Sequence, residues 1–507
     1  MRISRFFTYF LISLGTIWVA VNLPSSFFRP THQIIRWSIP QTIPGYNPNS
    51  APPILIADQN RTVHAFSSQW LESDDNTSKP SKAIMYHQWT YESGWTKPVD
   101  ILLSPIKEAR VTDAFIDSDG IIHLIFFGGD GEAANIYYSQ APVSAAYSAW
   151  AWSNPIVIGE GAKDPENAVL VKGKQGDLIV VYYGEKDGTG IYITKSDDNG
   201  NNWSEPNPFF LATSENPNIG LISVIASESG WLHAIWGVYN IGGQGRGIYY
   251  ARSQNADDWS IPTLLEGAQN DLGTQTPAII EYKDTLFAFY NQTPKIMMRR
   301  SSDNGVTWKD PVIMFPRHIG VNGTLSPVID GAENLHIFFG QRISGDPDIH
   351  GMWHSEWNND RWTEPDAVIS GPQVTDLDGN NSFDPYDANA IVSQGNVILV
   401  TWRTDPGLKG NGVWFSSKLL DIPELPIITP EPEVLQTGEV ITTTNITETQ
   451  IDKVTLENTQ DLPATSLDLS SSPRETSIST IIIYGIAPVL MLILTIIVWR
   501  IVQVRKN

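Results

Sequence analysis

The chain has 507 residues, which is too long for one ordinary compact domain. A net charge of −22 argues against a nucleic-acid-binding protein, because such a protein needs a basic surface to replace phosphate counterions. The absence of cysteine excludes disulfides, thiolate metal sites and a cysteine nucleophile. The 18 Trp, 17 Tyr, 39 Gly and 34 Pro residues favour an all-β fold with many short strands and turns.

Residues 1–29 have the pattern of a secretory signal peptide. Arg2 and Arg5 precede an apolar run from Phe6 to Val21. No clear small-x-small cleavage site follows Ala20, so an uncleaved signal anchor is the alternative. Either interpretation places the chain that follows, as far as the C-terminal apolar segment, outside the cytoplasm.

A short Trp motif recurs between residues 30 and 423. It consists of Trp, then Ser, Thr or Lys, then any residue, then Pro, and its seven copies begin at Trp37, Trp95, Trp152, Trp203, Trp259, Trp308 and Trp362. The copies are 49 to 58 residues apart, which is enough for four short strands and their turns. The repeat therefore predicts a β-propeller over residues 30–423.

Each repeat unit has the same internal order. A first apolar strand ends in an acidic or Gly turn, as at residues 114–120, and a nearly continuous apolar strand follows, as at residues 121–127. Continuous apolar character indicates burial on both faces. The third strand is aromatic, and we expect the Trp motif to form the fourth strand. This strand lies at the outer edge of the sheet, where Pro is tolerated because no backbone N–H is needed for pairing. His123, His233 and His336 recur at one strand position, which indicates a role in packing.

The strand count predicts how the ring closes. The last unit, residues 387–417, supplies three strands but no Trp motif, whereas the motif at Trp37 has no three strands before it. We therefore expect an N-terminal strand at residues 34–42 to complete the last blade, which gives seven blades. A six-bladed ring with a spare unit is the alternative.

Two turns before the Trp motif fit the pattern S-x-D-x-G-x-x-W. They are formed around Ser196, Asp198, Gly200 and Trp203, and around Ser301, Asp303, Gly305 and Trp308. The pattern resembles the Asp-box, or bacterial neuraminidase repeat, of the sialidase-like β-propellers. Asp can bond the amides of its own turn, Gly supplies positive φ and Trp buries its ring, so these residues are expected to be structural.

The resemblance implies a specific catalytic site that this chain matches only in part. Sialidases use three arginines for a carboxylate, an Asp acid, and a Tyr nucleophile assisted by Glu, and their first arginine lies in an Arg-Ile-Pro signature. That signature is missing, because residues 36–40 belong to the Trp repeat. We therefore expect recognition of a glycan or protein ligand and assign no catalytic residue. An exo-α-sialidase-type hydrolase is the alternative, and a non-catalytic envelope scaffold is a third hypothesis.

In such a propeller the loops between strands two and three share one face with the connections between blades. Candidate ligand-binding residues on that face are Arg246, Arg342, Arg403, Glu185, Asp164, Tyr386 and Asp387. No cofactor is expected. Asp376, Asp378 and Asn380 alternate like the ligands of a calcium loop, but Gly stands fourth instead of sixth and position twelve is not Glu.

The C-terminal part of the sequence predicts a membrane anchor. Residues 424–477 are rich in Pro, Thr, Ser and Glu and hold ten acidic against two basic residues, which is typical of a disordered stalk. Residues 478–499 are predicted as a transmembrane helix, because residues 481–499 carry no charge. The basic tail at residues 500–507 indicates a cytoplasmic C-terminus. We expect a single-pass cell-membrane protein whose partners are the bilayer and an external carbohydrate or cell-surface protein.

Overall fold

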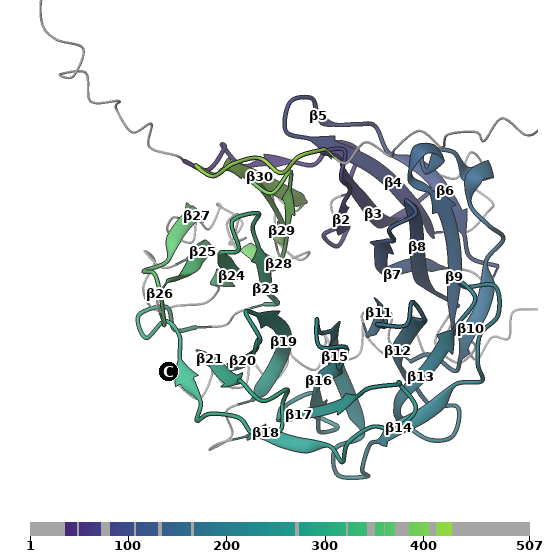
Figure 1. The fold of residues 1–507 in the computed structure, drawn as a ribbon, viewed down its shortest axis with the longest axis vertical. Coiled ribbons are helices and arrows are strands. Elements are labelled where there is room, and N and C mark those ends of the chain that lie inside the picture. The colour runs from purple at the N-terminus through teal and green to yellow at the C-terminus, as the bar shows by residue number, and fades with distance from the viewer. Residues whose placement is uncertain are drawn as a thin grey trace, which may run out of the picture. The chain divides into compact units, whose positions relative to one another are not determined.

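The computed structural model describes residues 36–47, 50–71, 82–105, 108–129, 134–163, 167–268, 273–320, 323–341, 350–358, 360–370, 385–404 and 412–427. Within these ranges the strands form seven antiparallel sheets of four or five strands each. Figure 1 shows the seven sheets arranged as blades around one axis. The predicted seven-bladed propeller is confirmed, and the six-bladed alternative is wrong.

The chain runs outward through each blade, starting beside the axis (Figure 1). The first strands of blades 1 to 7 are β2 (Ile54–Ala57), β7 (Ala109–Ile116), β11 (Ala168–Lys172), β15 (Asn218–Ala226), β19 (Thr274–Tyr282), β23 (Leu325–Ile329) and β28 (Pro385–Ser393). The second strands are β3 (Val63–Trp70), β8 (Ile121–Gly128), β12 (Leu178–Gly184), β16 (Leu232–Tyr239), β20 (Thr285–Gln292), β24 (Leu335–Gln341) and β29 (Val397–Thr404).

The outer half of each blade follows in the same order. The third strands are β4 (Lys82–Thr90), β9 (Asn135–Pro142), β13 (Gly190–Ser196), β17 (Gly245–Ser253), β21 (Lys295–Ser301), β25 (Gly351–Asn358) and β30 (Val413–Leu419). The outermost strands are β6 (Val99–Leu103), β10 (Ile156–Glu160), β14 (Asn207–Leu211), β18 (Thr263–Gly267), β22 (Val312–Ile313), β27 (Asp366–Ser370) and β1 (Gln41–Thr42). Short extra pieces are β5 (Gly94–Trp95), β26 (Arg361–Trp362) and the 3-10 turns η2 (Val143–Ala145) and η3 (Ala149–Ala151).

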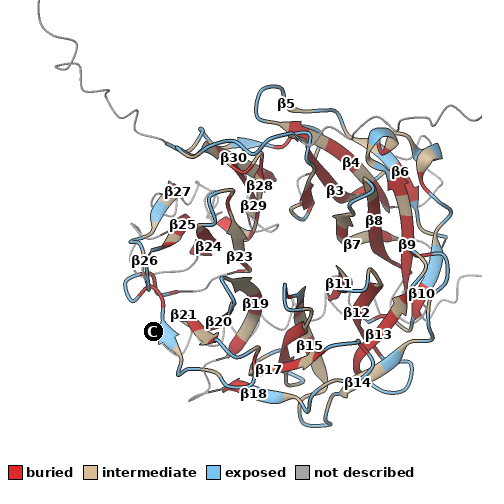
Figure 2. Ribbon diagram, viewed as in Figure 1, coloured by how far each residue is buried: buried red, intermediate tan, exposed pale blue. Residues whose placement is uncertain are grey.

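The core lies between neighbouring blades. Every residue of β12 and of β24 is buried, as their continuous apolar sequences predict. Figure 2 shows the same contrast around the ring, with buried middle strands and exposed segments at the outer edge. Each blade thus packs both faces of its sheet against its neighbours and leaves its rim to solvent.

The Trp motif leads into the fourth strand and does not form it, which corrects our expectation. Each fourth strand begins directly after the Pro, as β14 does after Pro206. Before that point, Ser204 donates its N–H to the carbonyl of Lys195 (2.8 Å), and its hydroxyl accepts the Lys195 N–H (3.1 Å). The same two bonds occur at Ser38, Thr96, Ser153, Ser260 and Thr363. The hydroxyl after Trp is therefore part of the sheet.

The N-terminal segment closes the ring through the last blade, as expected from the strand count. Gln41 pairs with Phe415 and Thr42 with Trp414, so β1 is the outer strand beside β30. Ser38 adds bonds from its N–H to the Ser417 carbonyl (2.8 Å) and from the Ser417 N–H to its hydroxyl (2.9 Å). The regular strand is only two residues long, but these bonds extend the seam toward the N-terminus.

Each Asp-box is a compact hydrogen-bonded turn. In blade 3, Asp198 accepts bonds from the Ser196 hydroxyl and the Asn202 N–H (both 2.8 Å), while Gly200 takes a φ of +87°. The Trp203 indole donates to the Gly200 carbonyl (3.1 Å). In blade 5, Asp303 accepts the corresponding bonds from Ser301 (2.8 Å) and Thr307 (2.9 Å), and Gly305 has a φ of +75°. Gly is needed because other residues rarely adopt this conformation.

The recurring histidines belong to buried polar chains. In blade 2, His123 contacts the Tyr138 hydroxyl through Nδ1 (2.6 Å) and the Asp117 carboxylate through Nε2 (3.2 Å). Blade 1 repeats this contact at Asp58, His64 and Tyr86, and blade 6 at Asp330, His336 and His354. In blade 4, His233 reaches Tyr250 (2.7 Å), but Ser227 occupies the position of the Asp.

The predicted signal (1–29), transmembrane helix (478–499) and tail (500–507) lie outside the described residues, as does the stalk beyond residue 427. The part of the chain that the structure describes contains no helix long and apolar enough to cross a membrane.

Candidate functional site

A pocket of about 760 Å³ opens on the face that carries the blade-to-blade connections and the loops between second and third strands. We call this the pocket face, and the opposite one, with the turns of the Asp-boxes, the Asp-box face. The lining comes from the innermost parts of blades 1, 2, 4, 5, 6 and 7 and includes Trp70, Lys82, Arg110, Thr112, Leu221, Thr276, Ser326, Asp387, Asn389 and Arg403. A concave site of this size fits a small ligand or part of a larger one.

Bulges in the first strands shape the pocket wall. The pairing of β15, β19 and β28 with their second strands shifts register at Leu221, Thr276 and Asp387, and each of these residues has a positive φ. β7 has a similar shift at Thr112. Bulges redirect side chains locally, and here the four affected residues all line the pocket.

Side chains on inner strands tie one blade to the next beneath this wall. The Ser68 hydroxyl accepts the Val111 N–H (2.8 Å), and the Ser326 hydroxyl accepts the Ala390 N–H (2.9 Å). Asp113 accepts the Leu170 N–H (2.9 Å). Burial raises the pKa of Asp113 to about 6, although the backbone N–H bonds favour its charged form. These bonds hold the inner strands beneath the pocket in fixed relative positions.

Two groups of charged side chains meet at the pocket. Arg403 directs Nε (2.8 Å) and Nη2 (2.7 Å) to one oxygen of Asp387, and both side chains are half-buried. On the other side, Lys82 and Arg110 both approach Glu108, each at 3.3 Å. The lining holds three cationic side chains, whereas Asp387 is its one carboxylate among the described residues.

An exposed aromatic ring completes the site. Trp70 ends strand β3 at the pocket, and its side chain is 43% exposed. The Lys82 ammonium lies 4.5 Å from the centroid of that ring, which is a cation–π contact. The Trp70 carbonyl also accepts a bond from the Asn47 side chain (3.3 Å), which fixes the incoming connection from blade 7.

The structure gathers only part of the predicted site. Arg403 and Asp387 line the pocket, and Tyr386 precedes Asp387 in β28. Glu185 forms an ion pair with Lys163 on blade 3, and Arg246 lies at the start of β17; neither lines the pocket. Asp164 and Arg342 lie outside the described residues. The grouping of Arg246 with Arg403 around one ligand is therefore not seen.

Sequence reasoning missed Trp70 and Lys82 and gave Arg110 no special weight. The available signal was the position of Trp70 at the end of a buried strand, where the other units place Gly, Tyr, Gln or Thr. Lys82 carried no such signal, because its sequence neighbourhood says nothing about which side chain it faces.

The described residues offer no metal centre. They contain no group of three or more His, Asp or Glu side chains placed to hold an ion. The calcium-loop candidates Asp376, Asp378 and Asn380 lie outside the described ranges.

Comparisons with known proteins agree with this architecture. Residues 162–365 match the family model of the DUF6242 beta propeller domain. These residues cover blades 3 to 5 and the first three strands of blade 6. The fold is a seven-bladed β-propeller with two hydrogen-bonded Asp-boxes. No curated protein matches this propeller chain in sequence.

Solved structures similar to this propeller include enzymes with different activities. A fungal alcohol oxidase in complex with copper has a TM-score of 0.50 and 12% identity, covering 76% of each chain. A polysaccharide lyase that acts as an ulvan lyase has a TM-score of 0.49 and 12% identity, over 74% of this chain and 95% of that one. A Trypanosoma rangeli sialidase has a TM-score of 0.42 and 11% identity, over 76% and 59%. At these identities the likeness shows the fold alone.

Proposed function

We propose that the propeller is a binding module that recognises an acidic carbohydrate in the central pocket. The observation that carries this proposal is the reversal of charge. In a protein with a net charge of −22, the pocket is lined by Lys82, Arg110 and Arg403, which outnumber the two carboxylates that they contact, Asp387 in the lining and Glu108 beside it. Guanidinium groups suit carboxylates and sulfates because they offer paired donors. The exposed Trp70 ring supplies a flat apolar surface for the C–H face of a sugar.

Binding without hydrolysis is favoured by the carboxylate inventory. Glycoside hydrolysis generally needs two carboxyl groups flanking the bond, or a Tyr nucleophile assisted by Glu. Among the described lining residues Asp387 is the only carboxylic acid, and Arg403 holds it in an ion pair. An ion-paired carboxylate is a poor general acid, because the neighbouring cation stabilises its charged form.

The chain ends of the propeller support a display role. Both ends of the described propeller chain lie on the Asp-box face. Ser38 lies there beside Ser417, and Leu425 donates its N–H to the Gln394 carbonyl (2.8 Å). Arg61, in a turn of blade 1 on that face, pairs with Glu424 (2.6 Å). If residues 478–499 anchor the protein in the cell membrane as we propose, the connection leaves from the face opposite the pocket. Protease added to intact cells should then release a propeller-sized fragment, and full protection of the propeller would contradict the proposed topology.

The binding proposal is tested with the full-length protein in detergent on an array of acidic and neutral polysaccharides. We expect binding to polygalacturonate, alginate, heparin or polysialic acid that weakens with salt and is lost in Arg403→Ala and Arg110→Ala. Lys163→Ala is the control matched to Arg110→Ala, because the Lys163 side chain is as exposed as that of Arg110 and is also ion-paired, but lies outside the pocket. Cleavage of a fluorogenic sialoside that Arg403→Ala abolishes would instead establish the hydrolase alternative. Absence of both would leave the scaffold hypothesis.

A further inference from the structure

A second cavity of about 740 Å³ lies on the Asp-box face, between blades 3 and 4. Its walls are turns from both blades: residues 173–177 and 197–204 of blade 3, and residues 229–230 and 254–257 of blade 4. None of the described residues that line the central pocket takes part in it. We infer that this cleft is a separate binding site for a neutral oligosaccharide.

At this cleft, blade 3 departs from the pattern of blades 1, 2 and 6. Gly173 has the same position in blade 3 as Asp117 in blade 2. Each residue begins its turn and donates its backbone N–H to the carbonyl of the residue four positions later. Ile179, six residues after Gly173, correspondingly replaces the histidine. The Asp–His pair is thus replaced by a residue without a side chain and an aliphatic one. Ile179 and Leu232 form a buried apolar floor.

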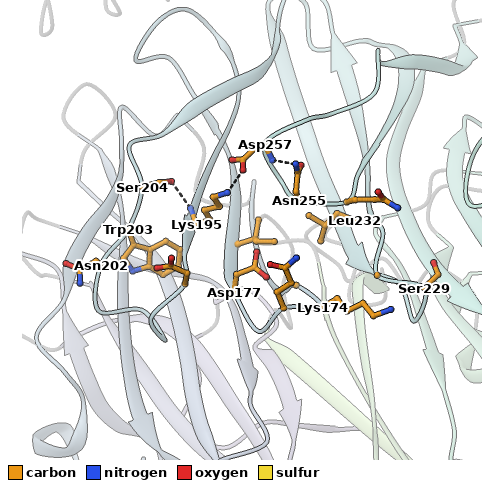
Figure 3. Close-up of a pocket in the computed structure, with 16 residues that line it drawn as sticks. Lys174, Asp177, Lys195, Asn202, Trp203, Ser204, Ser229, Leu232, Asn255 and Asp257 are labelled. Atoms are coloured by element: carbon orange, nitrogen blue, oxygen red, sulfur yellow. Dashed lines mark hydrogen bonds and ion pairs between the residues drawn. The ribbon is translucent and has the colours of Figure 1, made fainter.

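Trp203 supplies a fixed aromatic wall (Figure 3). Its indole N–H donates to the Gly200 carbonyl, and its ring packs against Tyr138 with centroids 5.2 Å apart. The side chain remains half-buried and lines the cleft. A ring held in this way loses little conformational freedom when a sugar stacks on it.

The polar groups around this apolar surface are amides, hydroxyls and carboxylates that are already oriented. Figure 3 shows Lys195 joined to Asp257 across the two blades and Ser204 bonded to the Lys195 backbone. The side-chain oxygen Oδ1 of Asn255 accepts the Asp257 N–H (3.0 Å). Sugar hydroxyls both donate and accept, so a mixture of amides, lysines and carboxylates can satisfy them.

The charge of the cleft selects a neutral ligand. Lys174 and Lys195 face three carboxylates, those of Asp177, Asp197 and Asp257, so the lining is close to balanced. In a protein with a net charge of −22 it offers no cationic surplus for an anionic sugar. This distinguishes the cleft from the central pocket, where cations outnumber the carboxylate.

The test uses the full-length protein in a detergent without a sugar headgroup, titrated with pentasaccharides of glucose, N-acetylglucosamine, mannose and xylose. Gln175→Trp, which fills the cleft from an exposed position, should abolish binding. Lys174→Ala combined with Gln254→Ala should weaken it about tenfold or more through lost hydrogen bonds.

Two control variants make the result specific. Lys283→Ala removes an exposed lysine from the corresponding turn of blade 5 on the same face, outside the cleft, and should leave binding unchanged. Arg403→Ala should also leave it unchanged, because that residue belongs to the central pocket. The inference is overturned if no neutral pentasaccharide binds, if Gln175→Trp binds normally, or if Arg403→Ala alone removes binding. Thermal unfolding verifies that each variant is folded.

Discussion

The Trp203 ring of blade 3 lies against the Tyr138 ring of blade 2, and the hydroxyl of that tyrosine contacts His123, which in turn contacts Asp117. Blades 4 and 5 repeat the arrangement with Tyr250 and Trp308, whose ring centroids are 5.0 Å apart. The Asp-box is therefore a connection between blades as well as a turn within one blade.

This contact predicts an unusual cost for replacing the Asp-box glycine. A Cβ on Gly200 would overlap the hydroxyl of Tyr138, and the φ of +87° adds backbone strain. We expect Gly200→Ala to lower the free energy of unfolding by about 3 kcal/mol or more. Gly120→Ala is the control, because Gly120 has a φ of +73° with no atom within 4 Å of a Cβ, and it should cost only about 1 kcal/mol. Equal losses in urea unfolding would contradict the packing argument.

The closing strand predicts that the N-terminal segment is essential to the ring. Trp37 packs on Phe338 and His354, with centroids 5.6 and 5.4 Å away, and donates to Asp366 (3.2 Å). Deleting residues 32–42 should cost at least the roughly 3–5 kcal/mol of a lost core aromatic, and the melting temperature should fall sharply or the protein should aggregate. Ile39→Ala, at an 82% exposed position in the same segment, should change little. A normal melting temperature after the deletion would mean that the ring closes without this strand.

In blade 4, His233 lacks the Asp partner found in blades 1, 2 and 6, and we therefore predict that the folded protein loses stability in acid. Burial, with the charge of Arg252, lowers the pKa of His233 from 6.5 to about 4. The unfolded state then binds more protons between about pH 6.5 and 4, so stability is lost as pH falls through that window. Ser227→Asp would supply the partner that His123 has in Asp117 and raise the pKa of His233.

We therefore expect urea unfolding of Ser227→Asp to show a smaller loss of stability between pH 7 and pH 4.5 than the unmodified protein. Ser229→Asp adds the same charge at an exposed position of the same turn and should leave the pH dependence as it was. An unchanged slope in Ser227→Asp would show that His233 does not govern this window.

For the central pocket we predict a substitution that increases ligand affinity instead of reducing it. Asp387→Asn removes the carboxylate that Arg403 holds, and Asn tolerates the φ of +53° at this position. If an acidic glycan binds here, its affinity should rise several-fold and its salt dependence should steepen, as isothermal titration would show. An affinity that falls as in Arg403→Ala would mean that the ion pair itself positions the ligand.

The repeat predicted the fold because each blade shows the same residues for a local reason. Trp203 and Gly200 stabilise the turn to which they belong, and the continuous apolar sequence of β12 indicates that the strand is buried on both faces. The sequence alone therefore predicts these parts of the fold. The fourth strand begins a few residues later than we expected, because the Trp motif bonds to the third strand before the Pro and the regular strand starts only after it.

The candidate site was harder to predict because its residues share no local pattern. Arg403 and Asp387 meet across a strand pair at a bulge, and a bulge redirects the side chains of the residues in it. Trp70 and Lys82 come together at the end of another blade. Such meetings depend on register shifts and loop paths, which hydrophobic periodicity does not encode.

The seam between Ser38 and Ser417 also governs the order of assembly. These residues are 379 positions apart, so the first strand made has no partner until almost the whole propeller has been synthesised. Blades 1 to 6 can form from neighbouring segments as the chain emerges, but blade 7 waits for a contact of very long range. During that interval the N-terminal segment is open to pairing with other chains. A cell that makes this protein must therefore protect an open ring until its last strand arrives.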